Sequence, residues 1–133
     1  MSNAASDFLE NKVLDHVLRY STAPYTAPST LYVGLFTAST GLETNSPSAE
    51  ISGYNYSRQT VTFGAAASGS SASNATVTFP AASGTWGTIS HVAIMDASTS
   101  GNVLFWGAVT TAKTIESGDT FQISSGNLTI SLS

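Results

Sequence analysis

The chain loses helical periodicity after residue 30 and breaks into short apolar runs. These runs are rich in β-branched and aromatic residues, and clusters of Gly, Asn, Ser and Asp separate them. Such a pattern predicts strands joined by turns. We expect strands at residues 30–37, 54–63, 75–79, 88–95, 103–109, 118–124 and 127–132.

Side-chain alternation adds detail to these strands. Apolar and polar residues alternate in three of them, which predicts that one face of each strand is buried and the other faces solvent. The apolar positions are Val61, Phe63, Val77, Phe79, Leu128, Ile130 and Leu132. Residues 31–36 and 103–106 are apolar on both faces, which favours central or covered strands. Residues 96–102 form a short polar connection that predicts a hairpin, and Gly turns at 116–119 and 124–127 favour a final meander.

Residues 6–20 carry the clearest helical pattern. Ser6 can cap the first turn, and Asp15 and Arg19 can pair across one turn. Phe8 falls near the polar side. A helix with apolar residues on both sides often contacts something beyond its own domain, although a local fold-back of the chain would also cover Phe8. The main apolar face consists of Leu9, Val13, Val17 and Tyr20.

These elements predict a mainly β fold, an antiparallel β-sandwich or jelly-roll-like module with one N-terminal α-helix. A chain of 133 residues is the length of one domain, so we expect a single domain over 1–133, with the helix at 6–20 and the β-sandwich over 30–133. The polar segments 38–53 and 64–74 are long loops, which in compact domains are usually functional or mobile.

Composition excludes several function classes. Only 12 side chains are charged, four Lys or Arg and eight Asp or Glu, whereas 22 Ser and 18 Thr supply neutral hydroxyls. A net charge of −4 without a basic cluster argues against nucleic-acid binding. The absence of cysteine removes thiolate metal sites and disulfides. No run approaches the ~20 apolar residues of a membrane helix, and the N-terminus lacks a secretory pattern, so we expect no membrane contact.

Catalytic chemistry is hard to assemble from these residues. His16 and His91 are the candidate bases, and we interpret both as structural, since strand alternation separates His91 from Asp96. The acidic residues occupy the helix, turns and loops rather than a paired site. Calcium is the plausible metal for the oxygen-rich turns 96–102 and 116–119, but neither matches a calcium-loop pattern. We therefore predict no enzyme, no cofactor and no metal.

Aromatic residues are the better candidates for a binding surface. Tyr54, Tyr56 and Arg58 fall on one face of the predicted strand 54–63, a composition that suits a protein interface, a carbohydrate platform or ordinary cross-strand packing. Trp86 stands between glycines in GTWG, where a tryptophan often closes the end of a sandwich.

The order of segments along the chain is distinctive. The helix FLENKVLDHVLR is followed by YTAPSTLYVGLFTA, YSRQTVTFGAA, a long stretch around TFPAASGTWGTISH, and SGDTFQISSGNLTISL. This order resembles a family of small tailed-bacteriophage and prophage virion proteins. The similarity runs from about Phe8 to Leu132 and is most specific from Val77 to Ala108. Members are often labelled tail fibre proteins, and some resemble the cement proteins of icosahedral phage heads.

The resemblance implies a structural virion protein. The interpretation that we favour is a capsid cement, or decoration, protein that binds the outer capsid surface and clamps neighbouring major capsid protein subunits after synthesis in the host cytoplasm. The alternatives are a tail fibre or tail-tip adaptor for host attachment and a carbohydrate-binding module. We expect a homo-oligomer, a dimer rather than a trimer. Candidate contact residues are Phe8, Leu9, Tyr54, Tyr56, Arg58 and Trp86, together with loops 38–53 and 64–74.

Overall fold

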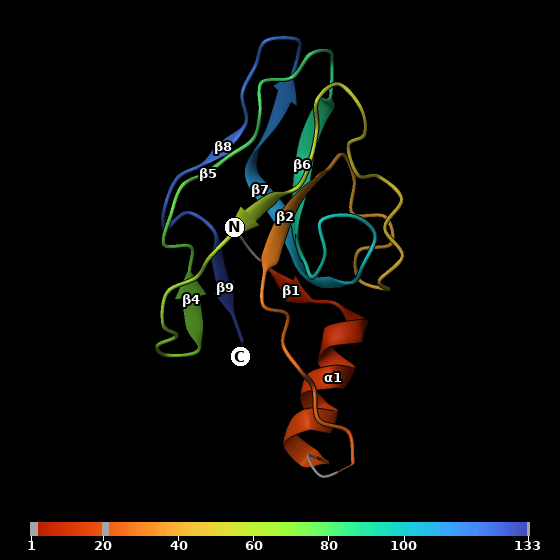
Figure 1. The fold of residues 1–133 in the computed structure, drawn as a ribbon, viewed down its shortest axis with the longest axis vertical. Helices are drawn as coiled ribbons and strands as arrows, with labels where there is room; N and C mark the ends of the chain where they lie inside the picture. Colours follow the sequence, from red (N-terminus) through yellow and green to blue (C-terminus); the bar gives the residue numbers. More distant parts are fainter. Residues whose placement is uncertain (1–2, 20–21, 133) are drawn as a thin grey trace.

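The computed structural model describes residues 3–19 and 22–132 and confirms a mainly β protein with a helix near its N-terminus (Figure 1). Every strand pairing in this described part is antiparallel. The elements in chain order are β1 (Ala4–Ala5), α1 (Asp7–Leu18), β2 (Leu31–Phe36), β3 (Gln59–Val61), β4 (Ser70–Ala72), β5 (Val77–Thr78), β6 (Gly87–Met95), β7 (Val103–Ile115), β8 (Gln122–Ile123) and β9 (Thr129–Ser131).

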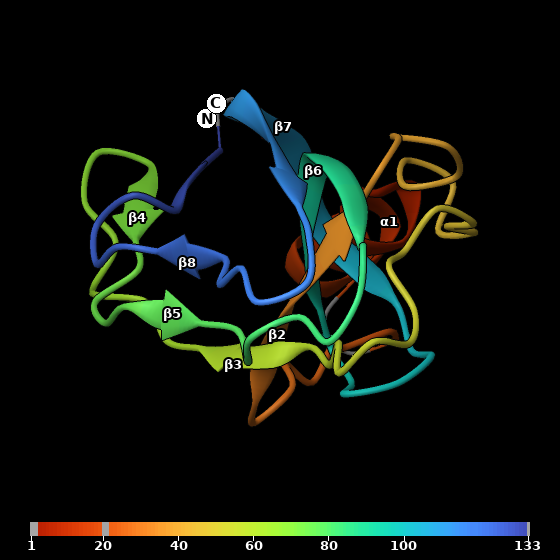
Figure 2. The same ribbon diagram turned by 90° about the horizontal axis from the view of Figure 1, so that it is seen from above.

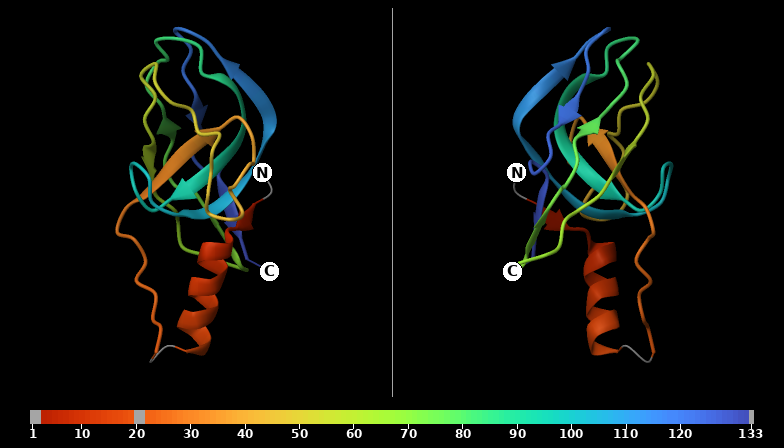
Figure 3. Two further views of the ribbon diagram at one scale, coloured as in Figure 1. Left: turned by 90° about the vertical axis from the view of Figure 1, so that its right-hand side faces the viewer. Right: turned by 60° about the vertical axis from the view of Figure 1, so that its left-hand side comes forward.

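Helix α1 begins at the predicted cap and projects from the β body (Figure 3). Ser6 accepts a hydrogen bond from the backbone N–H of Leu9 at 3.3 Å, and Leu9 is the buried residue of the helix. Asp15 and Arg19 form the predicted ion pair at 3.5 Å. Tyr20, the predicted last helical residue, lies outside the described residues. No helix in the described part of the chain is long and apolar enough to cross a membrane.

The main sheet contains five strands in the order β1-β7-β6-β2-β3. Strands β6 and β7 form the predicted hairpin around residues 96–102. Strand β2 lies between β6 and β3, with Val33 opposite both Ile94 and Gln59. The two segments that are apolar on both faces are thus interior strands, as their sequence pattern predicts.

Two short ribbons, β4-β9 and β5-β8, form a second layer opposite the sheet (Figure 2). Backbone hydrogen bonds extend these pairings, including Ser73 N–H to Leu128 O at 2.8 Å and Ala82 N–H to Asp119 O at 2.9 Å. The predicted C-terminal meander is therefore wrong. Strands β8 and β9 pair with β5 and β4 instead of with each other.

The hydrophobic core fills the space between the two layers. The alternation patterns predict most of it correctly, but Leu132, which directly follows β9, is 60% exposed. Four aromatic rings pack at one end of this core with centroids 5.5 to 6.5 Å apart, which are Tyr56, Phe79, Trp86 and Phe121.

The predicted strand 54–63 is shortened to β3. Gly53, Tyr54 and Asn55 have φ values of 75°, 50° and 70°, and residues in the left-handed region cannot continue an extended strand. The chain turns there before β3 begins.

Two further boundaries differ from the prediction. Strand β7 runs to Ile115 instead of ending at 109, because it follows the whole length of β6. Strand β4 lies within the predicted loop 64–74, where the sequence SSA gives no apolar signal but its backbone pairs with β9.

Candidate functional site

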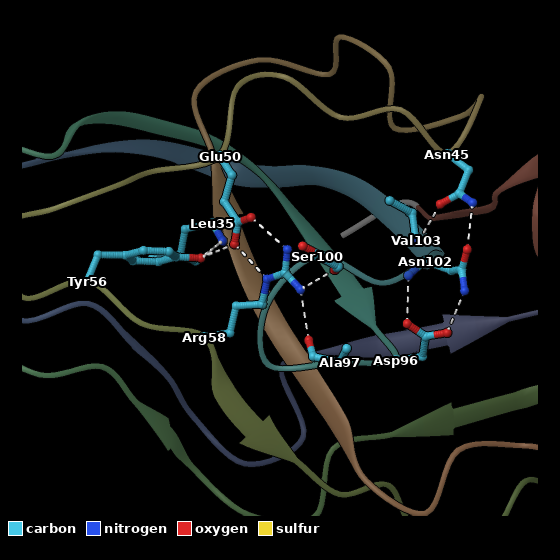
Figure 4. A network of polar contacts seen from close by, with 10 residues as sticks. All are labelled: Leu35, Asn45, Glu50, Tyr56, Arg58, Asp96, Ala97, Ser100, Asn102 and Val103. Atoms are coloured by element: carbon cyan, nitrogen blue, oxygen red, sulfur yellow. Dashed lines mark hydrogen bonds and ion pairs between the residues drawn. The ribbon is translucent and has the colours of Figure 1, made fainter.

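A network of polar side chains lies beside the edge of β2 (Figure 4). The guanidinium of Arg58 donates to both carboxylate oxygens of Glu50, from Nε at 2.8 Å and from Nη2 at 2.7 Å. The Arg58 side chain is 6% exposed and that of Glu50 is 24% exposed. This bidentate bond raises the pKa of Arg58, which therefore stays charged.

Tyr56 joins the same carboxylate to the sheet. Its hydroxyl donates to Glu50 at 2.7 Å and accepts from the backbone N–H of Leu35 at 3.0 Å. The Tyr56 hydroxyl thus provides a hydrogen-bond partner for the Leu35 N–H, which the shortened strand β3 does not reach. Burial, together with the neighbouring Glu50 charge, raises the pKa of Tyr56.

The remaining donors of Arg58 hold the β6–β7 hairpin loop. Its Nη1 donates to the carbonyls of Ala97 and Ser100, both at 2.8 Å. Arg58 therefore links the loop before β3 to a loop some 40 positions later in the chain.

A second set of bonds continues across the same hairpin. Asp96 accepts from the backbone N–H and the amide of Asn102, at 2.6 and 2.8 Å. Asn45 donates to the Asn102 side chain at 2.9 Å and accepts from the Val103 N–H at 2.7 Å. Segment 38–53, predicted as a long loop and a candidate contact segment, is tied to the sheet by Asn45 and also buries Leu42.

This network is a set of structural braces. Its carboxylates and amides are engaged with one another and with backbone groups. The arrangement stabilises three loops at one side of the sandwich.

The structure divides the predicted aromatic stripe. Tyr56 and Arg58 are committed to the network, whereas Tyr54 is 58% exposed. Trp86 is buried, and its Nε1 donates to the Tyr54 carbonyl at 2.9 Å, so it closes the core as its glycine-flanked position suggests. The exposed Tyr54 side chain is accessible from outside, and its ring lies against Gly84, where an added Cβ would come within 2.3 Å of it.

Phe8 and Leu9 have different surroundings on α1. Leu9 packs inward. Phe8 meets the ring of Tyr25 edge to face, with centroids 6.5 Å apart. The chain after the helix therefore folds back over Phe8, the local alternative that the sequence leaves open. A contact role for the six predicted interface residues stays a prediction.

The two histidines are hydrogen-bonded locally. The Nδ1 atom of His16 accepts from the Tyr25 N–H at 3.0 Å, and that of His91 lies 2.8 Å from the Ser90 hydroxyl. Asp96 is bonded to Asn102 instead, so the structure does not join it to His91. These hydrogen bonds hold both imidazole rings in place, and their purely structural role stays a prediction.

Three carboxylates that lie far apart in the sequence meet at the start of α1. Asp7, Glu10 and Glu43 place oxygens within 4.8 Å of one another, and Glu43 also accepts from Nε1 of Trp106 at 2.9 Å. The helix dipole stabilises acidic side chains at this end of a helix, which accounts for the cluster without a ligand.

Four apolar side chains on one side of α1 form the apolar helix face, which we define as Val13, Leu14, Val17 and Leu18. They are 37% to 74% exposed. The sequence pattern identifies Val13 and Val17 as apolar positions but predicts nothing about exposure. Whether the body covers such a face depends on the angle at which the helix leaves the sheet, which a local pattern does not encode.

A hollow beside this face continues it onto the β body. Its lining includes Val13, Leu14, Phe105 and Leu132. Phe105 and Leu132 also border a second, almost wholly apolar hollow of about 320 Å³, whose other walls include Leu31, Phe63, Ile94 and Ile130. An apolar surface thus runs from α1 onto the body.

Comparisons with known proteins identify the family. The family model described as "Podophage GP4 fiber I protein gp80" matches residues 4–131. A comparison with curated proteins finds no match. The family match covers almost the whole chain and confirms the resemblance to phage virion proteins. The chain belongs to the podophage GP4 fiber I protein gp80 family and is a structural protein of a phage virion.

Proposed function

We propose that this protein is a non-enzymatic connecting module of a phage tail fibre, an adaptor between the fibre and its attachment point. The observation that carries this proposal is the match to a fibre protein family over residues 4–131. The family description favours the tail over the capsid location that the sequence features suggested.

The geometry supports a connecting role. A sandwich whose loops are braced by Arg58 and Asn45 is a rigid body, and α1 projects from it with an uncovered apolar face. A rigid body with a protruding apolar element can bind neighbours by burial of apolar surface, without a conformational change. The chain has no internal repeat of the kind that builds a long fibre shaft, so an adaptor or tip fits it better than a shaft.

A second candidate is the capsid cement protein of the sequence-based interpretation. It would bind the outside of the head and clamp neighbouring major capsid protein subunits. The compact sandwich and its neutral, hydroxyl-rich surface favour this role, because a cement protein has to pack against an already folded shell. Neither role uses catalysis, a cofactor or a nucleic-acid contact.

A nonsense mutant of the gene in its own phage separates the two roles. The fibre proposal predicts particles with full, stable heads that adsorb poorly, and purified protein or a complementing plasmid should restore adsorption. The cement candidate predicts normal adsorption with heads that lose DNA on heating or in chelator. Normal adsorption together with fragile heads would overturn the fibre proposal.

A further inference from the structure

Strand β7 is paired on one side only over most of its length. Strand β6 lies along one side of it, whereas β1 covers the other side only opposite Phe105 and Trp106. Within residues 3–19 and 22–132, no strand other than β1 pairs with that second side. The part of β7 beyond Trp106 is therefore a free sheet edge, and such an edge offers its backbone N–H and C=O groups to another strand.

This edge also separates from β6 at residues 109–112. The register passes from Ile89 opposite Lys113 to His91 opposite Ala108, so residues 109–112 of β7 lie opposite Ser90 alone. In the described part of the chain, no backbone hydrogen bond joins residues 109–112 to a segment outside the β6–β7 hairpin. A bulge of this kind turns the backbone out of the regular ladder and leaves some of its groups unpaired.

A hollow of about 290 Å³ lies between this free edge and the second layer. Residues of β7 line one side of it, and residues of β8 and of the following turn line the other. The lining also includes the core residues Val92, Phe121 and Leu128. Strand β8 pairs with β5 and not with β7, so the sandwich is open between β7 and β8 (Figure 2).

An extended segment of this chain already occupies the adjoining part of the same opening. Ala4 and Ala5 pair with β7. The side chain of Asn3 bonds both backbone groups of Ser131 in β9, donating to its O at 3.3 Å and accepting from its N–H at 3.1 Å. Residues 3–5 therefore connect β7 to β9 at the start of the opening. The hollow continues this line along β7, so its position suits a further extended segment.

Lys113 determines the charge of the hollow. It is the one charged residue in the lining, and within the described residues it takes part in no ion pair. The lining thus contains no carboxylate, although the chain as a whole carries a net charge of −4. A lysine on a free edge discourages indiscriminate strand pairing, and it favours a partner that places a carboxylate opposite it.

We infer that an extended segment of a partner protein binds in this hollow as an additional strand beside β7. Its backbone pairs with the free edge, its apolar side chains cover Phe121 and Leu128, and an aspartate or glutamate of the partner faces Lys113. In strand addition of this type, main-chain hydrogen bonds give affinity and the side chains give specificity. The inference does not depend on the proposed function, because it applies equally to a neighbour in the tail and to one in the head.

A displayed library of random, short linear peptides supplies the probe. Selection on the purified chain should enrich peptides with apolar residues at alternate positions and one acidic residue. Magnetic resonance titration with the synthetic form of an enriched peptide should shift the signals of residues 109–113 and 122–124, and exchange of the amide hydrogens of residues 109–112 should slow on binding. A library without enriched peptides, or shifts confined to other surfaces, would overturn the inference.

Two variants of equal net charge test the role of Lys113. Lys113→Glu and Lys12→Glu each change the net charge from −4 to −6, but only the first alters the hollow. We expect Lys113→Glu to raise the dissociation constant of the enriched peptide about fivefold or more, and Lys12→Glu to leave it nearly unchanged. Far-UV circular dichroism checks that both variants fold. Equal affinities for the two variants would contradict the predicted carboxylate contact.

Backbone methylation of the same peptide distinguishes strand pairing from simple apolar adhesion. Methyl groups on the nitrogens of alternate residues remove the N–H donors along one edge of the peptide and keep its side chains. At least one of the two alternating patterns should abolish binding, and two methylated peptides that bind like the original would refute strand addition. Protection of amides 109–112 that rises with the concentration of the chain alone would assign the edge to a second copy and overturn the partner assignment.

Discussion

Arg58 holds Glu50 by two parallel hydrogen bonds of 2.7 and 2.8 Å while its remaining donors hold the backbone of the β6–β7 loop. One side chain therefore connects its own segment to Glu50, 8 positions earlier, and to a loop some 40 positions later. In the absence of disulfides, such a brace fixes loops that a small sandwich would otherwise leave loose.

We expect Arg58→Met to lower the free energy of unfolding by about 2–4 kcal/mol, because it leaves the half-buried Glu50 carboxylate without its counter-charge. Denaturant unfolding at neutral pH measures the change, and hydrogen exchange should show faster opening of residues 96–102. Arg19→Met is the matched control. Its exposed pair with Asp15 should contribute less than about 1 kcal/mol. Equal losses in the two variants would contradict the bracing role.

Tyr56 makes stability sensitive to high pH. Its pKa is raised in the folded chain, whereas in the unfolded chain it titrates near pH ~10. The unfolded state then binds fewer protons than the folded state above that pH, so stability should fall by up to about 1.4 kcal/mol per pH unit. Below pH ~10 this contribution is fully present.

The Tyr56→Phe variant tests that dependence. It should lose about 1–3 kcal/mol at neutral pH, because the Leu35 N–H loses its partner, but its stability should fall less steeply with pH above about 10. Urea unfolding from neutral to alkaline pH measures how steeply the free energy of unfolding falls with pH in the variant and in the parent chain. Tyr25→Phe is the comparison, since the pKa of Tyr25 is also raised but its side chain does not join the network. An identical pH dependence in Tyr56→Phe and the parent chain would exclude Tyr56 as the cause of the stability loss at high pH.

Ser6 joins α1 to the sheet. Its buried hydroxyl donates to the Val103 carbonyl and accepts from the Leu9 N–H. We expect Ser6→Ala to cost about 1–2 kcal/mol and to speed hydrogen exchange in the first turn of α1. Ser52→Ala, at an exposed position, should leave both measurements unchanged. Unchanged exchange in Ser6→Ala would show that the cap does not hold the helix.

Alanine substitutions at Gly41 and Gly53 distinguish the stability cost of backbone strain from that of a steric clash. Both have positive φ, at 76° and 75°, but an added Cβ would meet the Ser46 carbonyl oxygen at 1.9 Å in the first case and nothing within 4 Å in the second. Gly53→Ala should therefore cost only the ~1–2 kcal/mol of a left-handed alanine. Gly41→Ala should cost clearly more and loosen segment 38–53. Thermal unfolding compares them, and similar melting temperatures would contradict the tight turn at Gly41.

The sequence predicts the interior strands well because their signal is local. Residues 31–36 and 103–106 are apolar on both faces, and the structure places both inside the main sheet. Alternation likewise identifies Val61, Val77 and Leu128 as buried. The pairing of β8 with β5 and of β9 with β4 is not predictable in this way, because turn residues indicate where a chain reverses and not which distant strand it joins.

The candidate site illustrates the same limit. Tyr56 and Arg58 are singled out by residue type, but their partner Glu50 lies in a segment interpreted as a long loop. The left-handed residues Tyr54 and Asn55 break the alternation on which the predicted stripe depends. Local sequence patterns also do not predict which side of α1 is exposed, since this depends on the angle at which the helix leaves the sheet.

The central claim is that this chain is a connecting module of the tail fibre. Cryo-electron microscopy of the intact phage, with focused reconstruction of the tail and of the capsid lattice, tests it most directly. We expect density that fits the sandwich and projecting α1 at the tail, where fibres attach. Density of this shape on the capsid lattice, with none at the tail, would contradict the claim and favour the cement role.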